Sequence, residues 1–237
     1  MKLMKVAVTG LLAIILIAGC GGDGDNDSEH ELPSLPPEEV IAKASPRLDE
    51  LKSFHFELKQ KGGGTPIAMD LELTAASGDI EPPDRLSMKM EATWGKQFME
   101  SKLITVGETT YMTNPLSGKW ENLSDDFTAV TLFQPDSGIK AVMESVTGLS
   151  MLEAEMVGGV LCYHLKGELD SEVLDSIAVG HAAEGLSVDT EIWIGGEDFL
   201  LRKVKFDGRI TEEEKEGIIR TLEISKFNEP VNIELPE

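Results

Sequence analysis

The chain has 237 residues, and its 43 acidic against 21 basic side chains give a formal net charge of −22. A surface of that charge repels phosphate backbones, which excludes nucleic acid as a partner. The length fits a single domain with a sizeable core. No group of Cys, His and acidic residues has metal-site spacing, so we expect no metal and no other cofactor.

The first twenty residues have the pattern of an export signal. Lys2 and Lys5 precede the uncharged run Val6–Ala18, which is too short to span a bilayer as a mature helix. The string Ile17-Ala18-Gly19-Cys20 resembles a bacterial lipobox, in which the cysteine thiol receives a diacylglyceryl group. The alternative is an ordinary signal peptide with an incidental cysteine.

The lipobox predicts cleavage between Gly19 and Cys20, with residues 1–19 as the signal peptide. Cys20 would carry acyl chains such as palmitate and hold the protein at the extracytoplasmic face of the cell membrane. Acylation of Cys20 would leave Cys162 without a disulfide partner. Residues 20–37 are rich in Gly, Asp, Ser and Pro, which predicts a disordered tether before a domain over 38–237.

Helical periodicity returns at three places in the domain. From Glu38 to Leu51 the apolar residues share one face, although Pro46 is expected to interrupt the helix. Residues 135–150 form a second predicted helix, with an apolar stripe that includes Ile139, Val142, Met143 and Val146. A short third helix is predicted over Asp170–Val179.

Between these helices, apolar residues recur at every second position, as in half-buried strands. In residues 53–61, Phe54 and Phe56 point one way, whereas His55 points to solvent and is a poor candidate for a catalytic base. About ten strands joined mostly by short turns predict an antiparallel meander. The expected fold is α+β: a large curved antiparallel sheet, with the helices packed in its concave face around a hydrophobic cavity.

Several short segments, in order, resemble the mycobacterial LppX/LprA/LprF/LprG lipoproteins, which share the open half-barrel fold of LolA and LolB. They include the lipobox, the hairpin VGETTYM at 106–112, the string EIWIG at 191–195 and the ending KFNEPV at 226–231. The resemblance implies an eleven-stranded open barrel around a cavity that holds the acyl chains of envelope lipids. It also implies a lipid or glycolipid ligand and an envelope transporter as partner. We expect a monomer.

The residues expected to line the cavity come from three predicted strands and the second helix. They are Phe54, Phe56, Met69, Leu71, Met88, Met90, Ile139, Val142, Met143 and Val146. Met and large aliphatic side chains suit an adaptable apolar pocket, but they serve equally well as plain core filling.

Three functions compete at this stage. The first is a membrane-anchored lipid carrier, and the second is an envelope interaction or regulatory module of the same fold with no lipid-transfer role. The third is a hydrolase, but the sequence holds no Gly-x-Ser-x-Gly elbow, no phosphate-binding Gly-rich loop and no His-Glu-x-x-His. We therefore expect no enzymatic activity. An open apolar cavity would favour the carrier, and a filled core with an exposed apolar sheet face would favour the module.

Overall fold

The computed structural model describes residues 32–67, 71–123, 138–175 and 182–236. They belong to one compact unit, Leu32–Glu237. The predicted signal peptide, Gly19, Cys20 and most of the predicted tether lie outside the described residues. Leu32 and Leu35, near the end of that tether, pack against the core of the unit.

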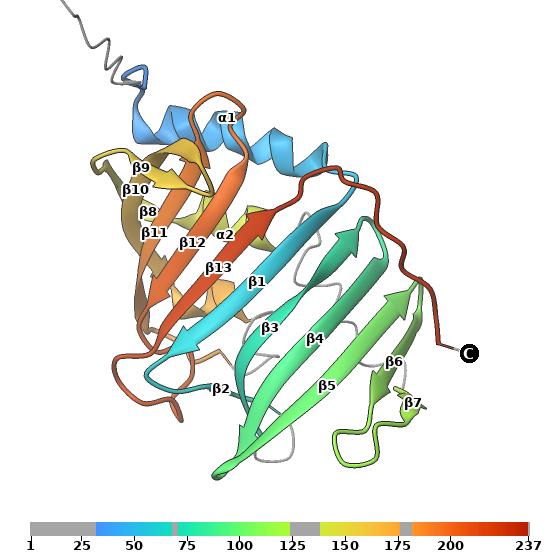
Figure 1. Cartoon of the computed structure of the whole chain (residues 1–237). Helices are drawn as coiled ribbons and strands as arrows, with labels where there is room; N and C mark the ends of the chain where they lie inside the picture. Colours follow the sequence, from blue (N-terminus) through green and yellow to red (C-terminus); the bar gives the residue numbers. More distant parts are fainter. Residues whose placement is uncertain (1–31, 68–70, 124–137, 176–181, 237) are drawn as a thin grey trace, which may run out of the picture. The chain divides into compact units, whose positions relative to one another are not determined.

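The described elements are two α-helices, one 3-10 helix and thirteen strands (Figure 1). In chain order they are α1 (Pro37–Asp49), β1 (Phe54–Lys61), β2 (Thr65–Pro66), β3 (Glu72–Glu81), β4 (Arg85–Trp94), β5 (Gln97–Val106), β6 (Thr109–Thr113), β7 (Trp120–Asn122), α2 (Ile139–Ser145), β8 (Thr147–Met151), β9 (Glu155–Val157), β10 (Val160–Asp170), η3 (Ser171–Leu174), β11 (Ser187–Gly195), β12 (Leu201–Asp207) and β13 (Ile219–Ser225).

All these strands join one antiparallel sheet that does not close into a barrel, as the sequence predicted. Eleven of them form a continuous path in the order β7-β6-β5-β4-β3-β1-β13-β12-β11-β10-β8, while β2 and β9 pair at its side. The two meanders meet where β1 pairs with β13. We call β1 and β3–β7 the N-terminal half of the sheet, and β8 and β10–β13 the C-terminal half.

Alternation divides the sheet into two faces. The inner face carries residues such as Phe56, Leu222 and Leu165, and it forms one hydrophobic core with the buried sides of α1 and α2. The helices make their main contacts with each other, with β8 and with η3. Their packing in a concave face stays a prediction.

The predicted helices differ from the observed ones in three ways. Among the described residues, the helix predicted over Asp170–Val179 is the short 3-10 helix η3, and Asp170 ends β10. Pro46 lies inside α1 and does not end it, although it removes one backbone hydrogen-bond donor. The helix predicted over 135–150 is also too long: α2 ends at Ser145 and β8 begins at Thr147. Gly148 has a φ of 62°, and the segment gains hydrogen bonds to β10 as a strand. Leu149 therefore lies on a strand.

The chain end joins the two halves of the sheet. Asn228 accepts a hydrogen bond from the Lys52 backbone through its side chain and donates its own N–H to Ser53 O. Further along, Ile233 is buried and its carbonyl accepts a bond of 3.1 Å from Arg85 Nη1. The final segment thus runs along the end of the sheet from β13 toward β4 (Figure 1).

Candidate functional site

Part of the inner face of the N-terminal half sets methionines beside small residues. The register places Phe56 opposite Gly78, Gly78 opposite Met88 and Met88 opposite Leu103. In the next row Ala76 lies between Leu58 and Met90. These rows set long, flexible side chains beside residues with almost no side chain, an arrangement suited to an adaptable apolar surface.

Gly78 is required by the close approach of β3 to β4. A Cβ at this position would lie 2.1 Å from Ser87 O and 2.7 Å from Met88 Cα. No side chain fits at that distance, so β3 must carry glycine here. The absence of a side chain between Phe56 and Met88 is therefore a consequence of the close packing of the β3 and β4 backbones.

Most of the residues predicted to line a cavity are brought together. Seven of them are no more than 7% exposed and belong to one hydrophobic cluster: Phe54, Phe56, Met88, Ile139, Val142, Met143 and Val146. Met90 is partly buried and packs against that cluster. Leu71 is partly buried, and Met69 lies outside the described residues. Whether these side chains line a lipid site stays a prediction.

The residues predicted to line the cavity include none on the inner face of β10–β13. This part carries fully buried large side chains, among them Leu165, Ile192, Val204 and Phe206. The same alternation that identified β1 and β4 marks these residues, since they recur two apart on each strand. What alternation could not show is that the C-terminal half lies beside the helices.

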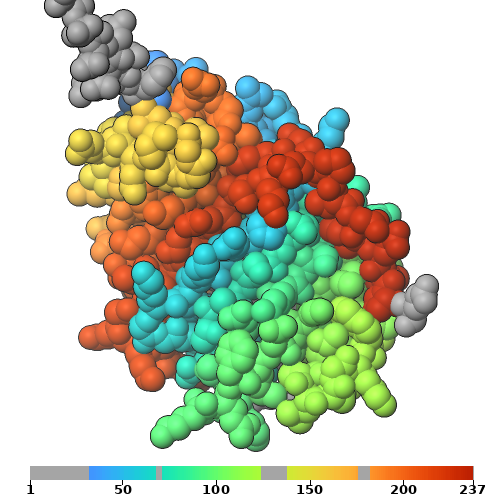
Figure 2. Space-filling model, in the orientation of Figure 1, coloured from blue at the N-terminus to red at the C-terminus, as the bar shows by residue number. Residues whose placement is uncertain are grey.

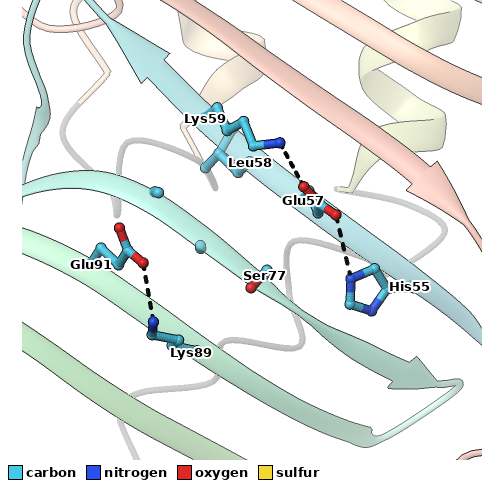
Figure 3. Close-up of a pocket in the computed structure, with 9 residues that line it drawn as sticks. His55, Glu57, Leu58, Lys59, Ser77, Lys89 and Glu91 are labelled. Atoms are coloured by element: carbon cyan, nitrogen blue, oxygen red, sulfur yellow. Dashed lines mark hydrogen bonds and ion pairs between the residues drawn. The ribbon is translucent and has the colours of Figure 1, made fainter.

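The outer face of the N-terminal half is charged. A depression of about 420 Å³ over β1, β3 and β4 is lined by alternate polar residues (Figure 3). Lys59 Nζ lies 2.6 Å from Glu57 Oε2, and this bond lowers the pKa of Glu57 and raises that of Lys59. The charged side chains of this surface are better solvated by water than by acyl chains.

Lys89 closes the other side of this depression. Its Nζ lies 2.8 Å from Glu100 Oε2 and 3.2 Å from Glu91 Oε1, and these hydrogen bonds raise the pKa of Lys89. His55, predicted to face away from Phe54 and Phe56, does so and pairs through Nδ1 with Asp79 Oδ1 at 2.7 Å. The outer face of these strands is thus not an exposed apolar surface.

A second polar cluster covers the outer face of the C-terminal half. His164 stacks on Trp193 with ring centroids 4.2 Å apart, and its Nε2 lies 2.7 Å from Glu191 Oε2. Although burial raises the pKa of Glu191, the hydrogen bonds from Lys205 and His164 outweigh it, and the net pKa is lowered. Trp193 donates to Glu155 and lies under Lys203 Nζ, 3.9 Å from the ring centroid. Every member has a partner within the cluster, as expected of a structural network.

Cys162 is buried on this outer side, in the same alternating series of β10 as His164. Burial raises the pKa of its thiol, whose Sγ contacts the Val160 carbonyl oxygen at 3.4 Å. A thiol with a raised pKa is a poor nucleophile at neutral pH.

Comparison with known protein families decides where the chain belongs. The family model of the LppX_LprAFG lipoproteins matches residues 36–233, which is nearly the whole domain. The chain belongs to the LppX_LprAFG lipoprotein family. The resemblance stated from the sequence is therefore confirmed. This family consists of lipoproteins rather than enzymes, in agreement with the expected lack of catalysis.

Individual relatives are distant in sequence. The lipoarabinomannan carrier protein LprG of Mycobacterium leprae is 23% identical over 242 residues, an alignment that covers 100% of this chain and 96% of LprG. The crystal structure of LprF from Mycobacterium bovis has a TM-score of 0.66 at 15% identity, covering 87% of this chain and 99% of LprF. The crystal structure of lipoprotein LppX from Mycobacterium tuberculosis has a TM-score of 0.59 at 17% identity, covering 84% and 100%. These two structures show the same fold.

Neither in length nor in apolar character does any helix among the described residues suffice to cross a bilayer.

Proposed function

We propose that this protein is an envelope lipoprotein that holds the acyl chains of a lipid or glycolipid on the inner face of its sheet and carries them across the cell envelope. The observation that carries the proposal is the family match over residues 36–233, together with the alignment of the whole chain to a lipoarabinomannan carrier.

The inner face of the N-terminal half supports this function physically. Met88 and Met90 lie on one face of β4, beside Gly78 and Ala76 of β3. Each methylene moved from water into such a surface contributes about 0.8 kcal/mol, so a long acyl chain gains much from it. The charged outer face offers no comparable surface, which leaves the inner face as the proposed binding side.

Cys20 is the proposed anchor, with acyl chains in the outer leaflet of the cell membrane and the domain beyond it. Acylation needs the thiol, so Cys20→Ala is expected to remove the covalent lipid. Mass spectrometry under denaturing conditions will measure this loss, because covalent acyl groups survive unfolding. Covalent acyl groups retained in Cys20→Ala would contradict the assignment of Cys20 as the anchor.

The ligand is tested on the same protein by native mass spectrometry. The full chain, purified without denaturation from a lipid-rich host, should carry a non-covalent mass that is lost on unfolding. Met90→Glu places a charge on the proposed binding face at a partly buried position. It should lower the ratio of lipid-bound to lipid-free protein at least about tenfold. Met156→Glu is the matched control, because Met156 is exposed on β9.

The alternative is an envelope interaction module of the same fold that transfers no lipid. The close burial of the predicted lining residues in one cluster favours it, since a filled core needs no ligand. The alternative would be favoured over the carrier if the chain carries no non-covalent lipid and its unfolding midpoint is the same with and without added lipid.

A further inference from the structure

The tip of the β4–β5 hairpin exposes two large aromatic side chains. Trp94 pairs with Gln97 across the turn Gly95-Lys96, and Phe98 follows directly. Trp94 is 54% exposed and Phe98 is 61% exposed. Each aromatic would lose a large apolar area from water on binding, so the pair marks a contact surface.

The two aromatics lie on opposite faces of the hairpin. Trp94 continues the inner-face series of β4 that holds Met90 and Ala92, whereas Phe98 pairs with Thr93 on the outer face. A groove on a folded partner protein would cover one face of a hairpin and leave the other in water. A bilayer interface surrounds an inserted tip and covers both faces, which favours a lipid surface as the occupant.

A neighbouring loop adds a third apolar residue at the same end of the sheet. Leu116, in the loop between β6 and β7, is 85% exposed. Its loop follows Thr113, whose hydroxyl accepts a bond of 2.8 Å from the backbone N–H of Lys102 on β5. Figure 1 shows the hairpin and this loop along one edge, and Figure 2 shows both projecting from the surface there.

The charge of these segments differs from that of the chain. Residues 92–99 contain no acidic residue and one lysine, Lys96, and residues 109–120 contain no acidic residue and one lysine, Lys119. Both segments lie in a protein with a net charge of −22. Aromatic residues with a nearby lysine are the side chains that anchor proteins at the headgroup level of a membrane. The missing acidic residues remove the repulsion that the rest of this surface would exert on phosphate headgroups.

We propose that the β4–β5 hairpin, assisted by the β6–β7 loop, inserts its tip into the interface of a phospholipid bilayer. The register separates this contact from the end of α1, because β1 begins beside that end with Phe54 opposite Ile80, and Ile80 is opposite Leu86 at the start of β4. Trp94 is the last residue of β4 and lies at the opposite end of that strand from Leu86. The contact therefore lies at the opposite end of these strands from the C-terminal end of α1, and the proposal does not depend on a lipid bound to the inner face.

A fluorescent label at the hairpin tests the proposal. Gln97→Cys, labelled with an environment-sensitive dye, places the probe between Trp94 and Phe98, while Cys162 is buried and does not compete for the dye. The full chain is reconstituted in phosphatidylcholine vesicles that contain phosphatidylcholine spin-labelled near the headgroup. We expect quenching of the dye at position 97. Glu213→Cys is the matched position, because it is exposed on the acidic β12–β13 loop at the same end of the sheet.

Removing the aromatics should abolish the contact without unfolding the domain, since both side chains are exposed. In Trp94→Ser/Phe98→Ser, the ratio of quenched to unquenched dye should fall about tenfold for each aromatic removed. Met156→Ser, which removes an exposed apolar side chain on β9, should leave it unchanged. Quenching at 97 no greater than at 213, or equal quenching in the double variant, would overturn the proposal. So would shielding of the dye without vesicles that rises with protein concentration, because the occupant would then be a second copy of the chain.

Discussion

The two halves of the sheet share one fold but differ in how their inner faces are filled. In the C-terminal half, large aliphatic and aromatic side chains such as Ile192 and Phe206 are fully buried. In the N-terminal half, Ile80 and Leu86 are equally buried, but the neighbouring rows set Met88 opposite Gly78 and Met90 opposite Ala76, and Met90 is only partly buried. One half is thus built as a rigid core, and the other retains the adaptable surface on which we place the ligand.

The C-terminal half also contains a buried ion pair. The Arg220 and Glu214 side chains are 0% exposed and bonded to each other, and Arg220 also donates to Thr65 Oγ1 at 3.1 Å and to Gly208 O at 3.0 Å. Glu214 Oε2 accepts from the Ile210 backbone at 2.7 Å. Burial lowers the pKa of Arg220, and Glu214 opposes this effect. The network fixes the β12–β13 loop to the inner face.

The largest expected effect comes from breaking this pair. Glu214→Ala leaves the Arg220 charge buried without its partner and should lower the free energy of unfolding by about 3–5 kcal/mol. Urea denaturation of the full chain will measure it. Glu213→Ala, one residue away and exposed, should change the value by less than about 0.5 kcal/mol. Similar values for the two variants would show that the loop is not held by this network.

A pair of truncations compares the two inner faces directly. Leu165→Ala leaves a cavity in the filled half and should cost about 2–5 kcal/mol, whereas Met90→Ala at a partly buried site should cost less than about 2 kcal/mol. Lipid added to the parent should raise its unfolding midpoint, and Met90→Ala should reduce that gain. If the two truncations lower the free energy of unfolding equally, the two inner faces are packed alike and the proposed difference is wrong.

A smaller, pH-dependent effect is expected on the outer face. A carboxyl whose pKa is lowered on folding adds stability above its unfolded pKa, and this is lost as the pH falls through the folded value. Glu191 is such a group, with a pKa below its ordinary value of 4.5. Glu191→Gln should therefore be less stable than the parent by about 1 kcal/mol at pH 7. The difference should vanish below the folded pKa of Glu191. Glu197→Gln, at an exposed position, should show no such pH dependence.

The smallest perturbation concerns a single thiol. Cys162 is buried and the pKa of its thiol is raised, so a maleimide should label it at least about a hundredfold more slowly in the native chain than in urea. Mass spectrometry of timed samples measures the rate. Fast labelling at neutral pH would mean that β9 does not cover the outer end of β10.

Local patterns in the sequence determined the strands, the sheet and the family. Period-two alternation identified β1 and β4, because a side chain's face depends only on its parity along the strand. It also placed His55 on the outer face. The lipobox at Cys20 depends on sequence alone and stays a prediction.

Tertiary structure decided the features that alternation along the sequence cannot predict, namely strand pairing and contacts between distant residues. Helical periodicity continued through Leu149, yet pairing with β10 makes residues 147–151 a strand, because backbone bonds to a neighbour outweigh a weak local preference. Arg220 has the alternation of a core residue, and only the folded loop brings Glu214 to it. The contrast between the two inner faces likewise arises from strand order, which places the helices beside β8 and Gly78 against Met88.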